Sequence, residues 1–372
     1  MKFNISNTDS ESNARVGCIE ASHGLIQTPV FMPVGTQGAV KAVHHRELRD
    51  EVNAEIILAN TYHLYLRPGA DLIEKSGGIH KFMSWDRNIL TDSGGYQVYS
   101  LASNRKITDE GVRFKSHIDG STHLFTPESV IDIQRSIGSD IMMMLDVCPS
   151  GSVSKQKWID ALNLTTKWAQ QAKKYYDETE PLYGYNQIIS PIVQGGTDLK
   201  LREQSAMELM ELDCDMHAIG GLAVGEPKNK MLEVINFMDT ILPKEKPRYL
   251  MGVGTPSDIL GAVKYGIDMF DCVMPTRSGR TGLAFTWDGK LNLKNSKFQS
   301  DKSPLDPDSN IRSLNLYSKS YLNHLIKTNE LLASMIISLH NVNFYQQFMS
   351  KIRKEIKSGT FNTFYKKYIN FF

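Results

Sequence analysis

Eight short apolar runs recur in the sequence, at residues 29–35, 55–60, 88–95, 140–146, 188–196, 217–221, 248–254 and 266–271. Runs that are apolar on both faces predict strands buried in a parallel sheet, and helical patterns lie between most of them. Strands that alternate with helices favour an α/β fold, and eight such units predict a (β/α)8 TIM barrel. A doubly wound open sheet is the alternative. Because the first strand is not followed by G-x-G-x-x-G, we favour the barrel.

The segments between these runs carry signals for helices and hairpins. Thr126 and Pro127 have the residue types that start a helix, with a capping hydroxyl followed by proline. Further helices are expected at about residues 154–176, 198–212, 227–242 and 255–265. Asp-Gly pairs flanked by strand-like residues predict two hairpins, at 112–125 and 283–293.

The sequence changes character after residue 300. Helices are expected at about 318–329, 330–339 and 343–357, followed by a basic tail at 361–372. We therefore expect a catalytic barrel domain with hairpin insertions at residues 1–300 and a helical, basic subdomain packed on it at 301–372. From Val273 onward there are 15 Lys and Arg against 6 Asp and Glu, whereas the preceding part carries 27 against 35. This asymmetry indicates contact with a polyanion, and a solvated basic surface is an equally good explanation.

Bulk composition narrows the class of protein. Apolar residues make up 41% and charged residues 22% of the 372 residues, as in globular proteins with a large core. No apolar run reaches the ~18 residues of a membrane span, and the N-terminus lacks a signal-peptide core, so we expect a cytoplasmic protein. The four cysteines are scattered without C-x-x-C spacing, which predicts neither a disulfide framework nor an evident zinc site.

Barrel enzymes build their active sites at the carboxyl ends of the strands. In this sequence those ends carry Asn60, Asp92, Asp146, Gln194, Gly221, Met251, Gly252 and Asp271. Carboxylate, carboxamide and bare glycine backbone can read the edges of a flat, polar heterocycle, while Tyr96 and Met251 can cover its faces. The alternative for each residue alone is a structural role as a cap or turn.

Two carboxylates that flank an anomeric carbon are the usual equipment for breaking a glycosidic bond. Asp92 and Asp271 come from the third and eighth predicted strands, so a closed barrel would place them across one mouth. Arg277 and Arg280 can clamp neighbouring phosphates. The residues therefore predict base exchange or hydrolysis at a nucleotide, within a polynucleotide.

Five motifs occur in a family-specific order: DSGGYQV (92–98), VQGG (193–196), IGGLAVGE (219–226), MGVGTP (251–256) and FDCVMPTR (270–277). Together they resemble bacterial tRNA-guanine transglycosylases, also called queuine tRNA-ribosyltransferases, and the likeness covers about residues 24–356. The resemblance implies that guanine at the wobble position of GUN-anticodon tRNAs (for aspartate, asparagine, histidine and tyrosine) is exchanged for a 7-deazaguanine. It also implies a covalent ribosyl-enzyme intermediate and a homodimer that holds the tRNA anticodon loop.

The resemblance also implies a role for each matching residue. Asp271 is expected to be the nucleophile and Asp92 the general acid/base. The expected substrate-binding residues are Asp146, Gln194, Gly221, Leu222, Tyr96, Met251 and Asn60, and the expected RNA-binding residues are Arg277, Arg280, Gly252 and Thr276.

One departure from the family concerns its structural zinc, which is held by C-x-C-x-x-C and a distant histidine. The corresponding cysteine positions are Ser309, Ile311 and Leu314, although His340 is retained. One imidazole without thiolates does not make a tetrahedral structural site. We therefore expect no zinc and no other cofactor, with Ile311 and Leu314 replacing the metal by apolar packing.

A second departure leaves the incoming base open. Val147 stands where bacterial members usually have Glu, whereas Leu222 to Gly225 follow the bacterial form. The bacterial form favours the small aminomethyl precursor preQ1, and Val147 leaves queuine salvage as the alternative. Two other functions compete. A non-catalytic partner subunit would have lost the catalytic carboxylates, which this chain keeps, and a nucleoside glycosidase would not need the basic C-terminal third.

Overall fold

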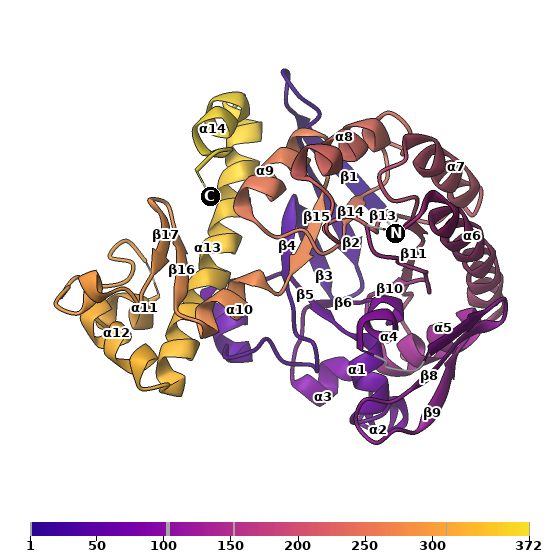
Figure 1. The fold of residues 1–372 in the computed structure, drawn as a ribbon, viewed down its shortest axis with the longest axis horizontal. Helices are drawn as coiled ribbons and strands as arrows, with labels where there is room; N and C mark the ends of the chain where they lie inside the picture. Colours follow the sequence, from indigo (N-terminus) through magenta and orange to yellow (C-terminus); the bar gives the residue numbers. More distant parts are fainter. Residues whose placement is uncertain (1, 102–104, 152, 310, 372) are drawn as a thin grey trace.

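The computed structural model describes residues 2–101, 105–151, 153–309 and 311–371 (Figure 1). Its two largest sheets are parallel and are surrounded by helices, so the expected α/β class is confirmed. Within the described ranges, we find no helix that is both long and apolar enough to cross a membrane.

The parallel strands form two sheets. One has the order β11-β10-β6-β5 and consists of β5 (Ile56–Ala59), β6 (Asn88–Thr91), β10 (Ile141–Met143) and β11 (Ile188–Ser190). The other has the order β12-β13-β14-β15-β4 and consists of β4 (Val30–Pro33), β12 (Ile192–Val193), β13 (His217–Ile219), β14 (Arg248–Leu250) and β15 (Met269–Cys272). Each of the eight predicted apolar runs overlaps one or two of these strands, so the expected strand positions are confirmed.

The two sheets approach each other at both ends. Strands β11 and β12 belong to a single apolar run and are separated only by Pro191, which has no N–H for a ladder hydrogen bond. At the other end, Val34, which directly follows β4, forms an isolated parallel bridge with Leu58 of β5. The Gly35 N–H donates to the Leu58 carbonyl at 2.6 Å beside that bridge.

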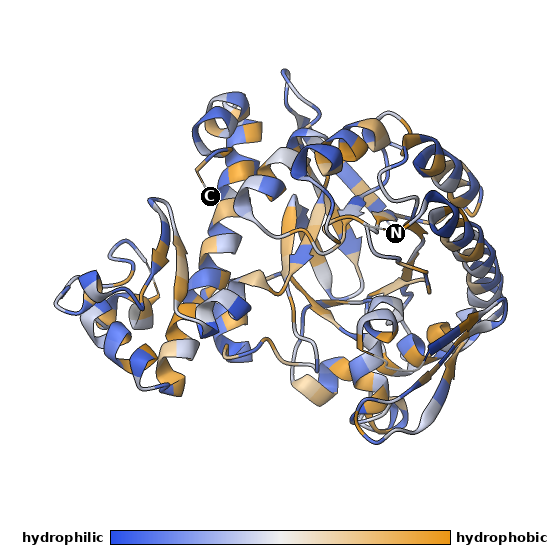
Figure 2. Ribbon diagram, in the orientation of Figure 1, coloured by the Kyte–Doolittle hydropathy of each residue, from blue (hydrophilic) through white to orange (hydrophobic). Residues whose placement is uncertain are grey.

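The apolar core has an inner and an outer part. The inner cluster contains strand residues such as Met32, Ile141, Ile192 and Tyr249, whereas two larger clusters lie between strands and helices. Because successive strand residues point to opposite faces, a strand such as β4 contributes Met32 to the inner cluster and Phe31 to an outer one. Figure 2 shows the matching pattern, with apolar strands inside and polar outer faces on the surrounding helices.

The predicted helices between the strands are confirmed. They are α5 (Pro127–Ile137), α6 (Lys155–Glu178), α7 (Leu199–Met210), α8 (Lys228–Asp239) and α9 (Pro256–Lys264). Thr126 and Ser129 form a reciprocal capping box at the start of α5. Asp198 and Thr255 cap α7 and α9 by accepting backbone N–H groups of the first turn.

Both expected hairpins are present. β8 (Gly111–Lys115) pairs with β9 (Thr122–Phe125), and β7 (Arg105–Thr108) adds a third antiparallel strand. β16 (Leu283–Thr286) pairs with β17 (Gly289–Asn292). Elements that the sequence pattern missed are β1 (Lys2–Thr8), β2 (Arg15–Ala21), β3 (Gly24–Thr28), η1 (Glu47–Glu51), α1 (Thr61–Leu66), α2 (Ala70–Lys75), α3 (Ile79–Met83) and α4 (Gly95–Leu101).

The C-terminal region contains α10 (Met274–Arg280), η2 (Ser296–Phe298), α11 (Arg312–Leu316), α12 (Lys319–Lys327), α13 (Leu331–Lys357) and α14 (Phe361–Tyr368). The expectation of separate helices at 330–339 and 343–357 is wrong, because α13 is continuous. The polar residues in the middle of α13, His340 and Asn341, are buried and hydrogen-bond other elements. Asn341 donates to the carbonyls of Pro275 and Leu283 and accepts from the N–H of Phe285.

Candidate active site

The polar residues expected at strand ends do lie there. Asn60 directly follows β5, Asp92 follows β6, Gln194 follows β12 and Met251 follows β14, while Asp271 lies within β15. Asp146 lies three residues beyond β10 and Gly221 two residues beyond β13. Because all these strands are parallel, their carboxyl ends open on the same side of the sheets.

Asp92 is a buried carboxyl group with a pKa suited to proton transfer. The Thr61 N–H donates to its Oδ1 at 2.9 Å, and the Asn60 carboxamide donates to its Oδ2. Burial raises the pKa of Asp92 to about 7, the two hydrogen bonds oppose this shift, and the charge of Asp271 adds to it. A carboxyl group that titrates near neutral pH can serve as both acid and base.

Asp271 has a different environment, in which one oxygen is held. Its Oδ1 accepts hydrogen bonds from the Tyr249 hydroxyl at 2.6 Å and from the Gly252 N–H at 2.7 Å. Burial raises the pKa of Asp271, and these two hydrogen bonds work against that rise. The two donors stabilise the carboxylate form, which is the form that a nucleophile requires.

Asp146 and Gln194 form a second polar pair at the strand ends. The Gln194 carboxamide donates to Asp146 Oδ2 at 2.8 Å, and the Ser93 hydroxyl donates to Oδ1 at 2.8 Å. Burial raises the pKa of Asp146. Gly221 lies against this pair, because a Cβ at that position would be 2.4 Å from Gln194 Oε1. The absence of a side chain therefore leaves the backbone of Gly221 accessible beside the amide.

The apolar residues of the predicted site differ in exposure. Leu222 is buried, Met251 is partly buried against the inner core cluster, and Tyr96 on α4 is 51% exposed. An exposed ring next to buried polar groups is available for stacking on a bound base.

Helix α10 carries the residues expected to contact RNA. Arg277 and Arg280 are exposed, whereas Thr276 is buried and its hydroxyl donates to the Val273 carbonyl at 3.4 Å. The two arginines are therefore available to a ligand in solution. Gly252 instead lies at the carboxyl group of Asp271, through its N–H.

Three residues of this site were missed by sequence reasoning. Thr61 and Ser93 hydrogen-bond the buried carboxyl groups of Asp92 and Asp146, and Tyr249 hydrogen-bonds Asp271. Ser93 follows Asp92 within a motif, so its position was a usable signal. For Tyr249 the usable signal was its place on the buried strand β14, two residues before Met251. Side chains two residues apart on a strand point to the same face.

The positions that correspond to the family's zinc ligands form an apolar core. Ser309, Ile311 and Leu314 are all buried, and Ile311 and Leu314 pack in the same cluster as residues of α12 and α13. His340 Nε2 donates to the Phe285 carbonyl at 2.7 Å, and its Nδ1 lies 3.8 Å from a carboxylate oxygen of Asp306. Ile and Leu offer no lone pair, so these residues do not fit a Cys3His zinc site.

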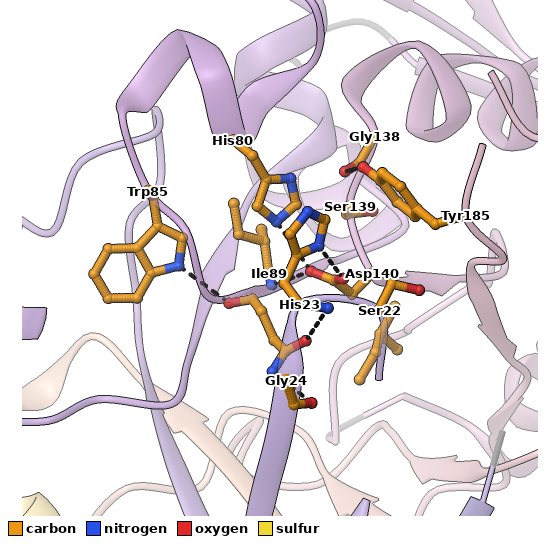
Figure 3. A network of polar contacts seen from close by, with 12 residues as sticks. Ser22, His23, Gly24, His80, Trp85, Ile89, Gly138, Ser139, Asp140 and Tyr185 are labelled. Carbon is orange, nitrogen blue, oxygen red and sulfur yellow. Dashed lines mark hydrogen bonds and ion pairs between the residues drawn. The ribbon is translucent and has the colours of Figure 1, made fainter. Parts of the chain in front are cut away.

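A separate polar cluster lies at the opposite, amino end of β10 (Figure 3). His23 Nδ1 lies 2.6 Å from Asp140 Oδ1 and His80 Nε2 lies 3.1 Å from Oδ2, while the Ile89 N–H donates to Oδ2 at 2.7 Å. The hydrogen bond to Asp140 raises the pKa of His23. One potential metal-ligand atom from each of His23, His80 and Asp140 lies within 4.8 Å of the other two, so a metal site has to be considered.

The ring geometry of this cluster favours hydrogen bonding over metal binding. The two imidazoles are stacked, with centroids 3.7 Å apart and planes 16° apart. Lone pairs in two nearly parallel planes do not converge on one ion unless a ring rotates. The arrangement therefore ties the turn between β2 and β3, helix α3 and strand β10 together through one buried carboxylate.

Comparison with known proteins agrees with this geometry. The sequence model of the family described as "Queuine tRNA-ribosyltransferase" matches residues 9–372. The chain is 49% identical over 372 residues to a queuine tRNA-ribosyltransferase of Thermoanaerobacter pseudethanolicus, covering 99% of this chain and 98% of that protein. It is 50% identical over 369 residues to that of Caldanaerobacter subterraneus subsp. tengcongensis (99% and 97% covered), and 48% identical over 363 residues to that of Zymomonas mobilis (98% and 94%). The chain therefore belongs to the queuine tRNA-ribosyltransferase family, a family of pentosyltransferases.

Proposed function

We propose that this chain exchanges the guanine at the wobble position of GUN-anticodon tRNAs for a 7-deazaguanine, through a covalent link between Asp271 and the ribose. The observation that carries the proposal is the pair of carboxyl groups at the carboxyl ends of β6 and β15. Asp271 has two donors that favour its ionised form, and Asp92 has a pKa of about 7. Membership of the family supports the tRNA substrate.

In the first half of the proposed reaction, a carboxylate oxygen of Asp271 attacks C1′ of the ribose. The glycosidic bond breaks, its electron pair goes to the departing guanine, and the base takes a proton from Asp92. In the second half, Asp92 takes a proton from the incoming base, whose nitrogen attacks C1′ and returns the electron pair of the ester to Asp271. The pKa of Asp92 near neutral pH supports both transfers, because the group is readily protonated and deprotonated there.

Recognition of the base is assigned to the second polar pair. Asp146 and Gln194 present a carboxyl group and a carboxamide, with the backbone of Gly221 and Leu222 beside them. These groups match the donor and acceptor edge of a guanine-like ring, and Tyr96 and Met251 would cover its faces. We assign Asn60, which hydrogen-bonds Asp92, to the substrate site as well.

We favour preQ1 as the incoming base, with queuine as the specific alternative. Val147 is only partly buried and packs against the core cluster that contains Leu145 and Trp168, and its N–H donates to the Thr165 hydroxyl at 3.0 Å. An apolar residue there offers no charge partner for the aminomethyl group of preQ1, so queuine remains the alternative.

The exposed Arg277 and Arg280 on α10 would bind the anticodon-loop phosphates, with Gly252 and Thr276 completing that edge of the site. We propose further that the enzyme acts in the cytoplasm as a homodimer in which the second subunit helps to hold the tRNA. The excess of Lys and Arg after Val273 supports contact with a polyanion.

We also propose that the two parallel sheets close into one (β/α)8 barrel. The Val34–Leu58 bridge supports closure at one junction, and the single residue Pro191 between β11 and β12 supports it at the other. Residues 1–300 would be the catalytic domain and 301–372 a subdomain without zinc. Figure 1 shows α13 running from that region to the strands, and its Gln346 donates to the Phe31 carbonyl of β4 at 2.8 Å.

The test is incorporation of labelled guanine into an unmodified tRNA with a GUN anticodon, by the purified full-length chain. Incorporation that is lost on changing the anticodon guanine to adenine would support the proposal. No exchange, with tight binding of the same tRNA, would contradict it and favour a non-catalytic partner role. Parallel reactions with preQ1 and queuine would then decide the incoming base.

A further inference from the structure

Tyr249 hydrogen-bonds the nucleophile of the proposed reaction, but it takes no part in the bond-making or proton-transfer steps. It belongs to β14, and its side chain is 0% exposed within the inner core cluster, against Met269 of the neighbouring strand. Packing on a strand fixes its orientation, so its hydroxyl is held in place before substrate binds.

The hydroxyl of Tyr249 and the N–H of Gly252 donate to the same oxygen of Asp271. Both hydrogen bonds end on Oδ1, at 2.6 and 2.7 Å, and no described residue donates to Oδ2. The two oxygens of this carboxylate are therefore unequal. One is held by two donors and the other is free to approach an electrophile.

The hydroxyl remains a donor throughout the working range of pH. Burial and the charge of Asp271 raise the pKa of Tyr249 well above its ordinary value. Conversely, the hydrogen bond from Tyr249 opposes the rise that burial causes in the pKa of Asp271. The ionisable groups that act on Tyr249 are the carboxyl groups of Asp271 and Asp92 and the thiol of Cys272.

We infer that Tyr249 is a positioning residue for the nucleophile, which holds Oδ1 of Asp271 so that Oδ2 is the atom that attacks C1′. This inference rests on the proposed function, because it assumes that Asp271 forms the ribosyl ester. After attack, Oδ1 becomes the carbonyl oxygen of that ester and stays between the same two donors. When the ester breaks, the returning charge is again stabilised by Tyr249 and Gly252, so one arrangement serves both halves of the exchange.

The test compares Tyr249→Phe with wild type in single-turnover formation of the tRNA adduct. Loss of a hydrogen bond to a charged group should slow adduct formation about 10- to 100-fold. KM for tRNA should change little, because the hydroxyl contacts the enzyme's own carboxylate. The acid limb of the pH–rate profile should move to higher pH, because Asp271 loses a donor that lowers its pKa.

The matched control is Tyr345→Phe, another buried tyrosine, whose hydroxyl donates to the Gly254 carbonyl and has no contact with Asp271. It should lose comparable stability but keep the wild-type rate and pH profile. Tyr249→Met, which also lacks the hydroxyl, provides a second test should the Phe variant fold poorly.

Three outcomes are distinguishable. A slower rate together with a displaced acid limb in a folded Tyr249 variant would support the inference. A wild-type rate, or a slower rate with the acid limb unmoved, would overturn it, since a purely structural role would not alter the ionisation of Asp271. Absence of any adduct in the wild-type enzyme would instead refute the proposed function on which the inference rests.

Discussion

Replacing Leu314 by Ala tests whether apolar packing has taken the place of metal in the C-terminal region. Leu314 is 0% exposed and packs in one cluster with Ile311 and residues of α12 and α13. A buried Leu→Ala change leaves a cavity and costs about 2–5 kcal/mol. The expected loss at this site is about 3 kcal/mol.

The corresponding change in melting temperature follows from chain length. An unfolding entropy of about 2.1 cal/mol/K per residue over 372 residues gives about 0.8 kcal/mol/K, if unfolding is cooperative. A loss of about 3 kcal/mol then lowers Tm by roughly 4 °C. The matched control is Leu316→Ala in the same helix, α11, where the side chain is 60% exposed and the change should stay within about 0.5 kcal/mol.

Calorimetry of both variants, with and without a chelator, is the assay. Packing without metal predicts a lower Tm for Leu314→Ala only, and no effect of the chelator on any of the three proteins. Metal analysis should find no stoichiometric zinc. One zinc per chain that is lost on His340→Ala, together with a chelator-induced fall in Tm, would show that metal rather than apolar packing holds this region.

Three further predictions concern pH and RNA. Single-turnover adduct formation should fall as pH rises through about 7, where Asp92 loses its proton. Asn60→Ala should move this fall to higher pH, because it removes a hydrogen bond that lowers the pKa of Asp92. A fall at the same pH in both proteins would argue against Asp92 as the acid. Arg280→Ala should weaken tRNA binding and reduce the slope of log K against log salt concentration by about 0.7. Lys174→Ala on α6 should do neither. Filter binding at several salt concentrations measures both effects. His23→Gln should lower Tm more at pH about 6 than at pH about 9. The pKa of His23 is raised in the folded protein, so its ion pair with Asp140 gives stability that is present below pH 6.5 and lost as pH rises through the folded pKa. Equal losses of Tm at both pH values would contradict a charged pair with Asp140.

The strands and outer helices were predictable because their signals are local. Runs such as those at β6 and β10 are apolar on both faces, and Thr126 and Thr255 cap helices within their own first turn. The N-terminal antiparallel sheet was missed because β1 carries alternating polar residues and is mostly exposed. Strand β1 pairs with β2 across residues 9–14, which carry no Asn-Gly or Asp-Gly turn signal.

Helix α13 could not be recognised as one helix from local signals, because the polar pair His340 and Asn341 interrupts its apolar run. Both residues are buried, and each hydrogen-bonds the backbone of β16. At the site, residue type and strand position indicated Asp92, Asp146, Gln194 and Asp271. The hydrogen bonds that distinguish these carboxyl groups required coordinates, because the donors come from other strands and loops.

The role of Asp271 as nucleophile is tested by mass spectrometry of the enzyme trapped with unmodified GUN-anticodon tRNA under denaturing conditions. We expect a covalent enzyme–tRNA adduct whose digested peptide carries the ribose on Asp271. We expect no adduct from Asp271→Asn, which keeps the shape of the side chain but not its charge. A ribosylated peptide that maps to Asp92, or an adduct that persists in Asp271→Asn, would contradict this role.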